Sequence, residues 1–189
     1  MEQFIRGNWR AGWAIDLHTL SCTKNSDGSF NTTRTELGEL VYQLKYHQDN
    51  SKINSISNIV SSFLRSRRVF SYIDVIIPVP PSKQRSLQPV PTIAKEVGRL
   101  TNKKVDLDYI KKLRSTSEIK QIDNPDERAQ ILSGAFKVID NRYKGKDVLL
   151  LDDLYRSGTT LKEITNVLYK YGKVKNVYVV TMTKTRKNR

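Results

Sequence analysis

The hydrophobic pattern of the amino-terminal third predicts one strand followed by two helices. Residues 13–18 alternate apolar and polar side chains, which is typical of a half-buried strand. The turn-forming residues 25–28 come next, so the first thirty residues are predicted to form a hairpin-like start. Two amphipathic helices are predicted next, and Thr33 and Thr35 are candidate caps for the first of them. The apolar faces of these helices consist of Leu37, Leu40, Val41 and Leu44 in the first, and Ile53, Ile56, Val60, Phe63 and Leu64 in the second.

The rest of the chain alternates short apolar strands with amphipathic helices. The expected strands are residues 74–79, 104–107, 135–139, 146–152 and 176–182. Helices are expected over 92–100, where Pro91 is placed to begin the helix, and over 160–171, which Gly172 would cap. Residues 114–132 are polar and lack an apolar period, so we expect a long loop there. This alternation predicts an α/β fold whose sheet is mostly parallel and flanked by helices.

Composition narrows the class of protein. The chain has 189 residues, and its 38% hydrophobic and 28% charged content fits one globular domain over residues 1–189 rather than a disordered chain. No segment approaches the ~20 apolar residues of a membrane span, and the amino terminus lacks the apolar core of a secretory signal. One cysteine, Cys22, excludes an internal disulfide, and with only two histidines a His/Cys metal cluster is nearly excluded. We therefore expect a cytoplasmic protein.

The chain is strongly basic, and its charge calls for an anionic partner. It contains 33 Lys and Arg against 19 Asp and Glu, a formal net charge of +14. Small basic clusters lie at residues 65–68, 103–104, 111–114 and 184–189. Such a field suits nucleic acid, a membrane surface or a small polyanionic substrate.

Residues 148–161 carry the most informative pattern. A buried apolar run ends in Asp152 and Asp153, a loop of small residues follows, and a helix begins near Thr160. Because ligands bind at the carboxyl ends of parallel strands, this junction is a candidate binding site. Phosphate is bound well by loop amides, hydroxyls and a helix amino terminus, and vicinal sugar hydroxyls donate to carboxylates. A phosphate beside a diol describes a ribose 5-phosphate. The phosphate-binding candidates are Arg156, Ser157, Gly158, Thr159 and Thr160.

The same segment has two alternative interpretations. It could be an ordinary strand–loop–helix junction with a hydroxyl cap and two solvated acids, although few such junctions place every element in this order. It could be a pair of acids that binds a metal for phosphoryl transfer, although only one acid-bearing strand end of this kind is evident. The chain has no G-x-x-x-x-G-K loop and no G-x-G-x-x-G after a strand, which argues against nucleoside triphosphatases and dinucleotide-binding enzymes.

Residues 150–161 resemble the signature of the type I phosphoribosyltransferases, in which a strand leads into two acids and a Thr/Ser/Gly loop. The resemblance implies the α/β core of that family and an enzyme that binds 5-phosphoribosyl 1-diphosphate. Asp152 and Asp153 would then be catalytic and hold the ribose hydroxyls. The residues that would bind the 5-phosphate side of the substrate are Tyr155, Arg156, Ser157, Gly158, Thr159 and Thr160.

Two more segments resemble the ComF-like branch of the same family. Residues 76–85 are similar to its strand and basic loop, which implies that the diphosphate is bound by Pro81, Ser82, Lys83 and Arg85. The polar stretch that begins at Arg114 is similar to its flexible loop, a lid that excludes water from the reacting carbon, and Arg114 would be catalytic. Solvated surface loops are the alternative for both segments.

The resemblance implies transfer of ribose 5-phosphate to a nitrogen acceptor, a nucleobase in the leading hypothesis, with release of diphosphate. Mg²⁺ would be bound mainly through the diphosphate, without a metal site made by the protein. Residues 1–35 would form a small hairpin and helical hood. The alternative is a non-catalytic sensor of the same substrate, or a ComF-like nucleic-acid-binding protein of competence or DNA uptake. A nucleic-acid partner on the basic surface and a homodimer stay open; a membrane partner is not expected.

Overall fold

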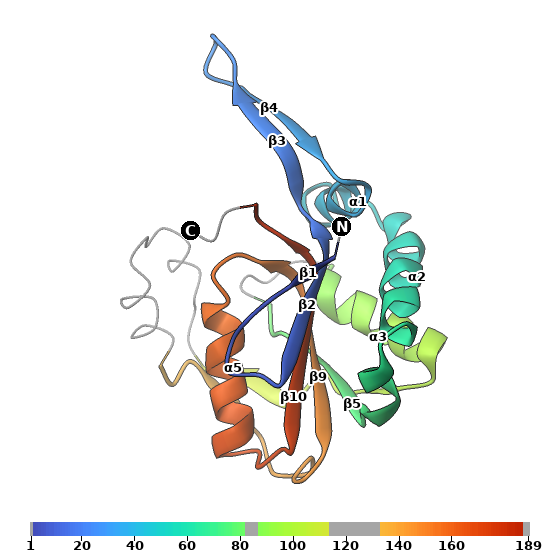
Figure 1. The fold of residues 1–189 in the computed structure, drawn as a ribbon, viewed down its shortest axis with the longest axis vertical. Coiled ribbons are helices and arrows are strands. Elements are labelled where there is room, and N and C mark those ends of the chain that lie inside the picture. The colour runs from blue at the N-terminus through green and yellow to red at the C-terminus, as the bar shows by residue number, and fades with distance from the viewer. Residues whose placement is uncertain (1, 82–86, 114–132, 187–189) are drawn as a thin grey trace.

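A six-stranded sheet forms the centre of the molecule (Figure 1). The computed structural model describes residues 2–81, 87–113 and 133–186. The strands of the sheet, in spatial order, are β1 (Gln3–Phe4), β2 (Ala11–Leu17), β10 (Asn176–Lys184), β9 (Asp147–Tyr155), β5 (Val75–Pro78) and β6 (Lys104–Val105). All neighbours are parallel except β1, which is antiparallel to β2. The predicted α/β fold with a mostly parallel sheet is confirmed.

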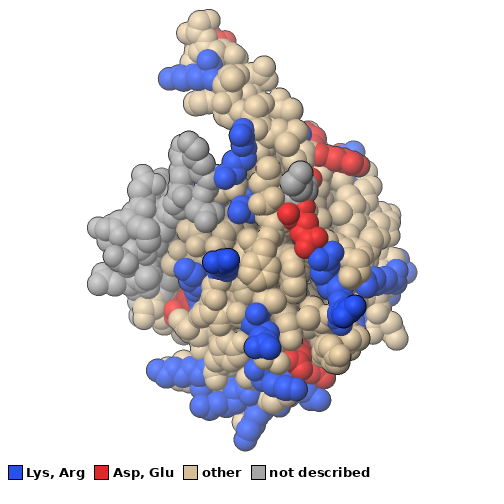
Figure 2. Space-filling view, in the orientation of Figure 1, with Lys and Arg blue, Asp and Glu red and all other residues tan. Residues whose placement is uncertain are grey.

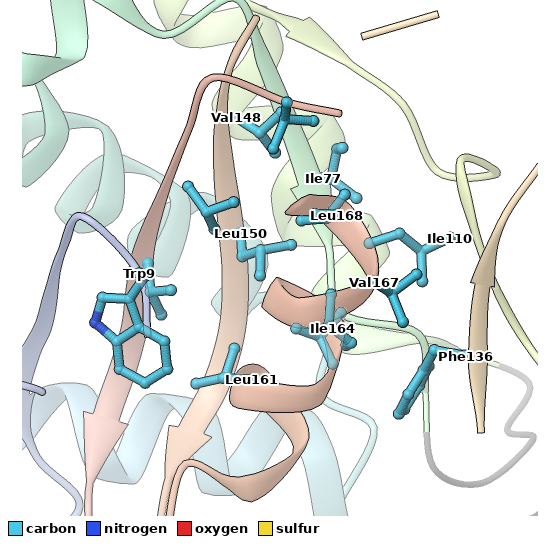
Figure 3. Close-up of a cluster of buried hydrophobic side chains, with 14 of the residues drawn as sticks. Trp9, Ile77, Ile110, Phe136, Val148, Leu150, Leu161, Ile164, Val167 and Leu168 are labelled. Carbon is cyan, nitrogen blue, oxygen red and sulfur yellow. The ribbon is translucent and has the colours of Figure 1, made fainter. Parts of the chain in front are cut away.

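Helices cover both faces of this sheet (Figure 1). Among the described residues, the helices on one face are α1 (Glu36–Tyr46), α2 (Lys52–Arg65) and α3 (Pro89–Thr101), while α5 (Thr159–Lys170) lies on the other. Successive residues of β9 point to opposite faces, so Val148 and Leu150 pack with α5 while Leu149 and Leu151 pack with the other three helices. Figure 3 shows the α5 side of this core. The apolar run of β9 is continuous because both of its faces are buried.

The helix boundaries follow from capping and proline chemistry. Thr35 caps α1 as predicted: its Oγ1 accepts the Gly38 N–H at 3.0 Å and donates to the Leu17 carbonyl at 2.5 Å, which ties α1 to the end of β2. The start of α3 lies earlier than predicted, at Pro89, because proline needs no N–H partner in the first helical turn. Among the described residues, no helix combines the length and the apolar character needed to cross a membrane.

The amino-terminal hairpin differs from its prediction. Its strands are β3 (Thr19–Lys24) and β4 (Phe30–Arg34), and it projects from the body (Figure 1). The predicted turn is confirmed: the Gly28 N–H donates to the Asn25 carbonyl at 3.1 Å, and Gly28 has φ +84°. The predicted strand 13–18 instead corresponds to β2, which pairs with β10 and belongs to the main sheet. Ala14 of this strand is fully buried in the hydrophobic cluster on the α5 side.

Smaller differences occur near the other elements. The prediction did not include the 3-10 helix η1 (Arg68–Tyr72) or the strand β7 (Ile110–Lys112), which pairs with β8 (Phe136–Val138). The proposed cap Gly172 is wrong, because the left-handed residue after α5 is Lys173, with φ +52°. Gly172 serves close packing, since a Cβ there would lie 2.8 Å from the Leu168 carbonyl oxygen. The expected loop 114–132 lies outside the described residues.

Candidate functional site

The candidate acids lie on a flank of β9 that β5 leaves uncovered. β5 pairs with β9 only as far as Leu151, whereas β10 continues to pair with β9 through Tyr155. β9 therefore runs three residues beyond its predicted end. In the described part of the chain, residues 152–155 have a neighbouring strand on one side only. Asp152 and Asp153 begin this flank, and both are half-buried.

The two carboxylates occupy different faces of the strand. Because strand residues alternate, Asp153 lies toward α1 and Asp152 toward α5. The Asp153 N–H also donates to Asp152 Oδ1 at 2.8 Å, which fixes one oxygen of that carboxylate. A polar ligand at this flank can therefore meet acceptor oxygens from both acids.

The loop after β9 brings donors to the amino terminus of α5. Gly158 precedes the helix with φ +74°, and a Cβ at this position would lie 2.7 Å from the ring of Tyr155. The hydroxyls of Ser157 and Thr159 are 2.9 Å apart, and both side chains are half-buried. Arg156 is half-buried, and no carboxylate among the described residues pairs with it. The first amides of α5 and two hydroxyls thus gather at a helix amino terminus, with Arg156 in the loop that precedes it, an arrangement that favours an anion.

The buried side chain of Tyr155 packs against Gly158 of this loop. Its ring is buried, and it contacts Trp9 edge to face with ring centroids 6.5 Å apart. Burial raises the pKa of its phenol, so the hydroxyl stays neutral at physiological pH. The side chain therefore lies in the core beneath Gly158, and its predicted part in substrate binding stays a prediction.

Sequence patterns gave no sign of the cation that pairs with Asp153. Lys45, in the last turn of α1, forms an ion pair with the Asp153 carboxylate, and both side chains are only 14% exposed. Burial by itself lowers the pKa of Lys45, but the charge and hydrogen bond of Asp153, together with the charge of Asp152, raise it above the ordinary value. A lysine more than one hundred residues away from its partner has no local signature, so only the fold identifies it.

A second group of charges surrounds the end of β2. His18 Nδ1 lies 3.3 Å from the Thr183 hydroxyl, which donates to the Asp153 carbonyl at 3.0 Å. Burial, followed by the charges of Arg34 and Lys45, lowers the pKa of His18, although Asp153 and Glu39 act in the opposite direction. His18 is therefore mainly neutral at pH 7 and can donate or accept a hydrogen bond.

Arg34 is held in place on two sides. Its guanidinium pairs with Glu39 at 3.2 Å and stacks 3.6 Å from the centroid of the Tyr42 ring. The amino-terminal segment thus adds Arg34, His18 and Lys45 to the edge that carries Asp153, and none of these three was predicted as a site residue.

Most of the remaining predicted site residues lie outside the described part of the chain. Pro81 is described; it is exposed and follows β5, whose end pairs with Leu151 beside the acids. The other members of the predicted diphosphate loop and the predicted catalytic arginine lie outside the described residues; these are Ser82, Lys83, Arg85 and Arg114. Their roles stay predictions.

Comparisons with solved structures define the fold. No protein-family model and no curated protein sequence matches the chain. The fold is similar to a structure described as the allosteric regulatory enzyme of purine biosynthesis, and to glutamine phosphoribosylpyrophosphate amidotransferase from B. subtilis complexed with ADP and GMP. Each has a TM-score of 0.53 and 18% identity over 85% of this chain. The chain spans only 34% and 35% of those two proteins.

A hypoxanthine phosphoribosyltransferase from Staphylococcus aureus aligns with 72% of this chain at 18% identity and a TM-score of 0.44, and the alignment spans 65% of that enzyme. At these identities the comparisons concern the fold alone. That fold is phosphoribosyltransferase-like, as the sequence predicted; the ComF-like branch stays a prediction.

Proposed function

We propose that this protein transfers ribose 5-phosphate from 5-phosphoribosyl 1-diphosphate to a nitrogen acceptor and releases diphosphate. One observation carries the proposal: Asp152 and Asp153 lie on the open flank of β9, and the next turn of chain places Ser157 to Thr160 at the amino end of α5. Acceptors for a diol and donors for a phosphate are therefore separated by a single short loop. The fold similarity to a phosphoribosylpyrophosphate amidotransferase supports the same substrate.

In the proposed reaction, the protein positions the sugar and stabilises the charge that develops on it. The Asp152 and Asp153 carboxylates accept hydrogen bonds from the ribose hydroxyls, while the loop amides, hydroxyls and Arg156 hold the 5-phosphate. With both ends of the sugar fixed, the acceptor nitrogen attacks the anomeric carbon. The bond from that carbon to the diphosphate oxygen breaks, and its electron pair leaves with diphosphate. Positioning and electrostatics supply the catalysis.

Mg²⁺ fits the donor set of this edge. The carboxylate oxygens of Asp152 and Asp153 are hard acceptors of the type that Mg²⁺ prefers, and we propose that they favour an ion that is held mainly by diphosphate oxygens and water. When bound, Mg²⁺ supplies positive charge against the departing diphosphate. β5 leads the chain out beside Leu151, so Ser82, Lys83 and Arg85 are proposed to bind the same diphosphate, and Arg114 to approach it.

The acceptor is proposed to be a nucleobase that binds on the side of α1 and the hairpin. His18 offers a hydrogen-bonding group 3.3 Å from the Thr183 hydroxyl that donates to the Asp153 carbonyl, and the charge of the Arg34 guanidinium acts on the same His18. A planar base with carbonyl oxygens and ring nitrogens suits such donors.

Two measurements test this proposal. The first is thermal unfolding with 5-phosphoribosyl 1-diphosphate and Mg²⁺, for which we expect a clear rise in Tm that adenosine monophosphate reproduces in part. The second is diphosphate release across a panel of nucleobases. Asp152→Asn and Asp153→Asn should each lower kcat/KM by at least about tenfold, because each removes one charged hydrogen bond to the ribose. Asp108→Asn, an exposed acid paired with Lys111, serves as the matched control.

A non-catalytic sensor of the same substrate is the second candidate, and the Lys45–Asp153 ion pair favours it, because Asp153 is already neutralised by a buried lysine. A sensor would show stabilisation by 5-phosphoribosyl 1-diphosphate with no base supporting turnover. Absence of stabilisation as well would contradict both candidates.

A further inference from the structure

The amino-terminal edge of the sheet, opposite the candidate site, carries a concentration of positive charge. Arg10 precedes β2, Lys144 and Lys146 precede β9, and Lys173 and Lys175 precede β10; all five side chains are exposed. We call these five residues the basic rim. Figure 2 shows Lys and Arg gathered at the lower end of the molecule, where Figure 1 places the starts of β9 and β10.

Backbone hydrogen bonds join the loops of the basic rim into one surface. The Gly145 N–H donates to the Lys173 carbonyl at 2.9 Å, and the Lys175 N–H donates to the Lys146 carbonyl at 2.9 Å. Arg10 is connected through its N–H, which donates to the Val177 carbonyl at 2.8 Å. The spacing of these cations is therefore set by the sheet rather than by mobile loops.

Little negative charge opposes the basic rim. Asp74 pairs with Lys146 at 3.5 Å, and Asp147 is buried and accepts from the Asn176 amide at 2.6 Å. Within the described ranges, no carboxylate lies within ion-pair distance of the other four cations of the basic rim. The positive charge is therefore available to an outside polyanion.

Two exposed tyrosines flank the basic rim. Tyr171 is 59% exposed and lies two residues before Lys173, with Lys170 Nζ 5.3 Å from its ring centroid. Tyr72 is 67% exposed and lies two residues before Asp74, the partner of Lys146. Exposed aromatic rings next to a basic surface are the features on which unpaired bases stack.

We propose that the basic rim binds single-stranded nucleic acid, with phosphates on its cations and bases stacked on Tyr171 and Tyr72. A duplex is less suited, because groove recognition needs a protruding helix or β-ribbon, whereas the basic rim is made of the short connections that lead into β2, β9 and β10. The strand β9 separates the basic rim from Asp153 by about 20 Å, at roughly 3.3 Å per residue. Binding at the basic rim therefore does not depend on the proposed enzyme activity.

The test is fluorescence anisotropy with a labelled oligothymidylate strand. The basic-rim variant Lys144→Gln, Lys173→Gln, Lys175→Gln is compared with Lys24→Gln, Lys95→Gln, Lys137→Gln, which removes the same charge from exposed positions elsewhere. We expect the basic-rim variant to bind at least about tenfold more weakly. The slope of log affinity against log salt should fall by about 2, since each lost phosphate contact contributes about 0.7 for a single strand.

Tyr171→Leu separates stacking from charge. It should weaken single-strand binding about fivefold or more and leave duplex binding unchanged.

Equal weakening by the two triple variants would overturn the inference, because net charge alone would then explain binding. Tighter binding of a duplex or of phosphatidylglycerol vesicles would overturn it in favour of another partner. Stabilisation by 5-phosphoribosyl 1-diphosphate should persist in the basic-rim variant. If the unaltered protein shows no such stabilisation, the enzyme proposal is contradicted, while the nucleic-acid proposal is unaffected.

Discussion

Lys45 forms a half-buried ion pair with one candidate catalytic acid, Asp153. Its ammonium pairs with Asp153 in a site where both side chains are 14% exposed, so solvent screens the pair only weakly. The pKa of Lys45 in the folded protein lies above its ordinary value of 10.5. The pair therefore stabilises the fold fully below that ordinary value, and its contribution is lost as the pH rises through the higher pKa of the folded state.

Lys45→Met should lower the free energy of unfolding at pH 7 by about 1–3 kcal/mol, because it leaves the Asp153 carboxylate half-buried without its partner. Urea unfolding measures the difference. The deficit should shrink above pH 10.5, where the unaltered protein also loses the pair. Lys95→Met, at an exposed position of α3, is the control. An equal loss in this control, or a deficit that does not change with pH, would contradict the assigned role.

Gly158→Ala tests the loop at the start of α5. The substitution combines an unfavourable φ of +74° with a Cβ 2.7 Å from the Tyr155 ring, so we expect a loss of about 1–3 kcal/mol in unfolding free energy. Stabilisation by 5-phosphoribosyl 1-diphosphate should fall as well. Gly28→Ala is the matched control, since it has φ +84° with no atom within 4 Å of the added Cβ and should cost only about 1 kcal/mol. Equal losses in the two variants would show that Tyr155 does not constrain the loop.

Among the elements, the β3–β4 hairpin is separable from the core. None of the residues 19–34 belongs to either buried hydrophobic cluster, and Leu20 and Phe30 are exposed. Thr19 and Arg34 are paired across the base of the hairpin, so a short turn can join them.

Replacement of residues 20–33 by Asn-Gly should preserve folding and change Tm by only a few degrees, because little apolar area is lost and Asn-Gly favours a tight hairpin turn. Circular dichroism during heating measures this. A variant of equal length in which residues 20–33 are replaced by Gly and Ser is the control for chain shortening. Loss of cooperative unfolding in the shortened protein would show that the hairpin belongs to the folding unit.

How far the sequence predicts an element depends on how local its signal is. α1 and α2 were predicted within about two residues because each has a periodic apolar face, and β5 because its apolar run is short and continuous. The extension of β9 through residues 153–155 was missed, since the apolar run is interrupted by Asp152 and Asp153, and only the pairing with β10 carries the strand on to Tyr155. The strand–loop–helix junction that carries Asp152, Asp153 and residues 156–160 was predictable from its contiguous pattern. Lys45, His18 and Arg34 were not, because their grouping around this edge depends on how α1, β2 and β4 are placed.

Across the whole molecule, charge is divided between two edges of one sheet. At the carboxyl edge, acids and cations are interleaved, with Lys45 against Asp153 and Arg34 against Glu39. At the amino-terminal edge, the basic rim is nearly unopposed. Among the described residues, the unpaired cations of the basic rim therefore repel one another at that second edge.

Screening this repulsion should stabilise the protein. Raising NaCl from about 10 mM to about 150 mM shortens the screening length from about 30 Å to about 8 Å, so we expect Tm to rise. Differential scanning calorimetry of the two triple variants then locates the effect. The basic-rim variant should gain less from salt than the variant at Lys24, Lys95 and Lys137. If salt raised the Tm of the two triple variants equally, the repulsion would not be centred on the basic rim.

The position of β10 has a consequence for how the chain reaches this structure. β10 is the last described strand to be synthesised, yet it lies between β2 and β9. Until residues 176–184 are available, the first long strand has no parallel neighbour and β9 keeps one side open. Such distant pairing slows folding and leaves apolar strand edges exposed while it is incomplete. A nascent chain of this protein therefore exposes an open edge on both β2 and β9 until β10 has been synthesised.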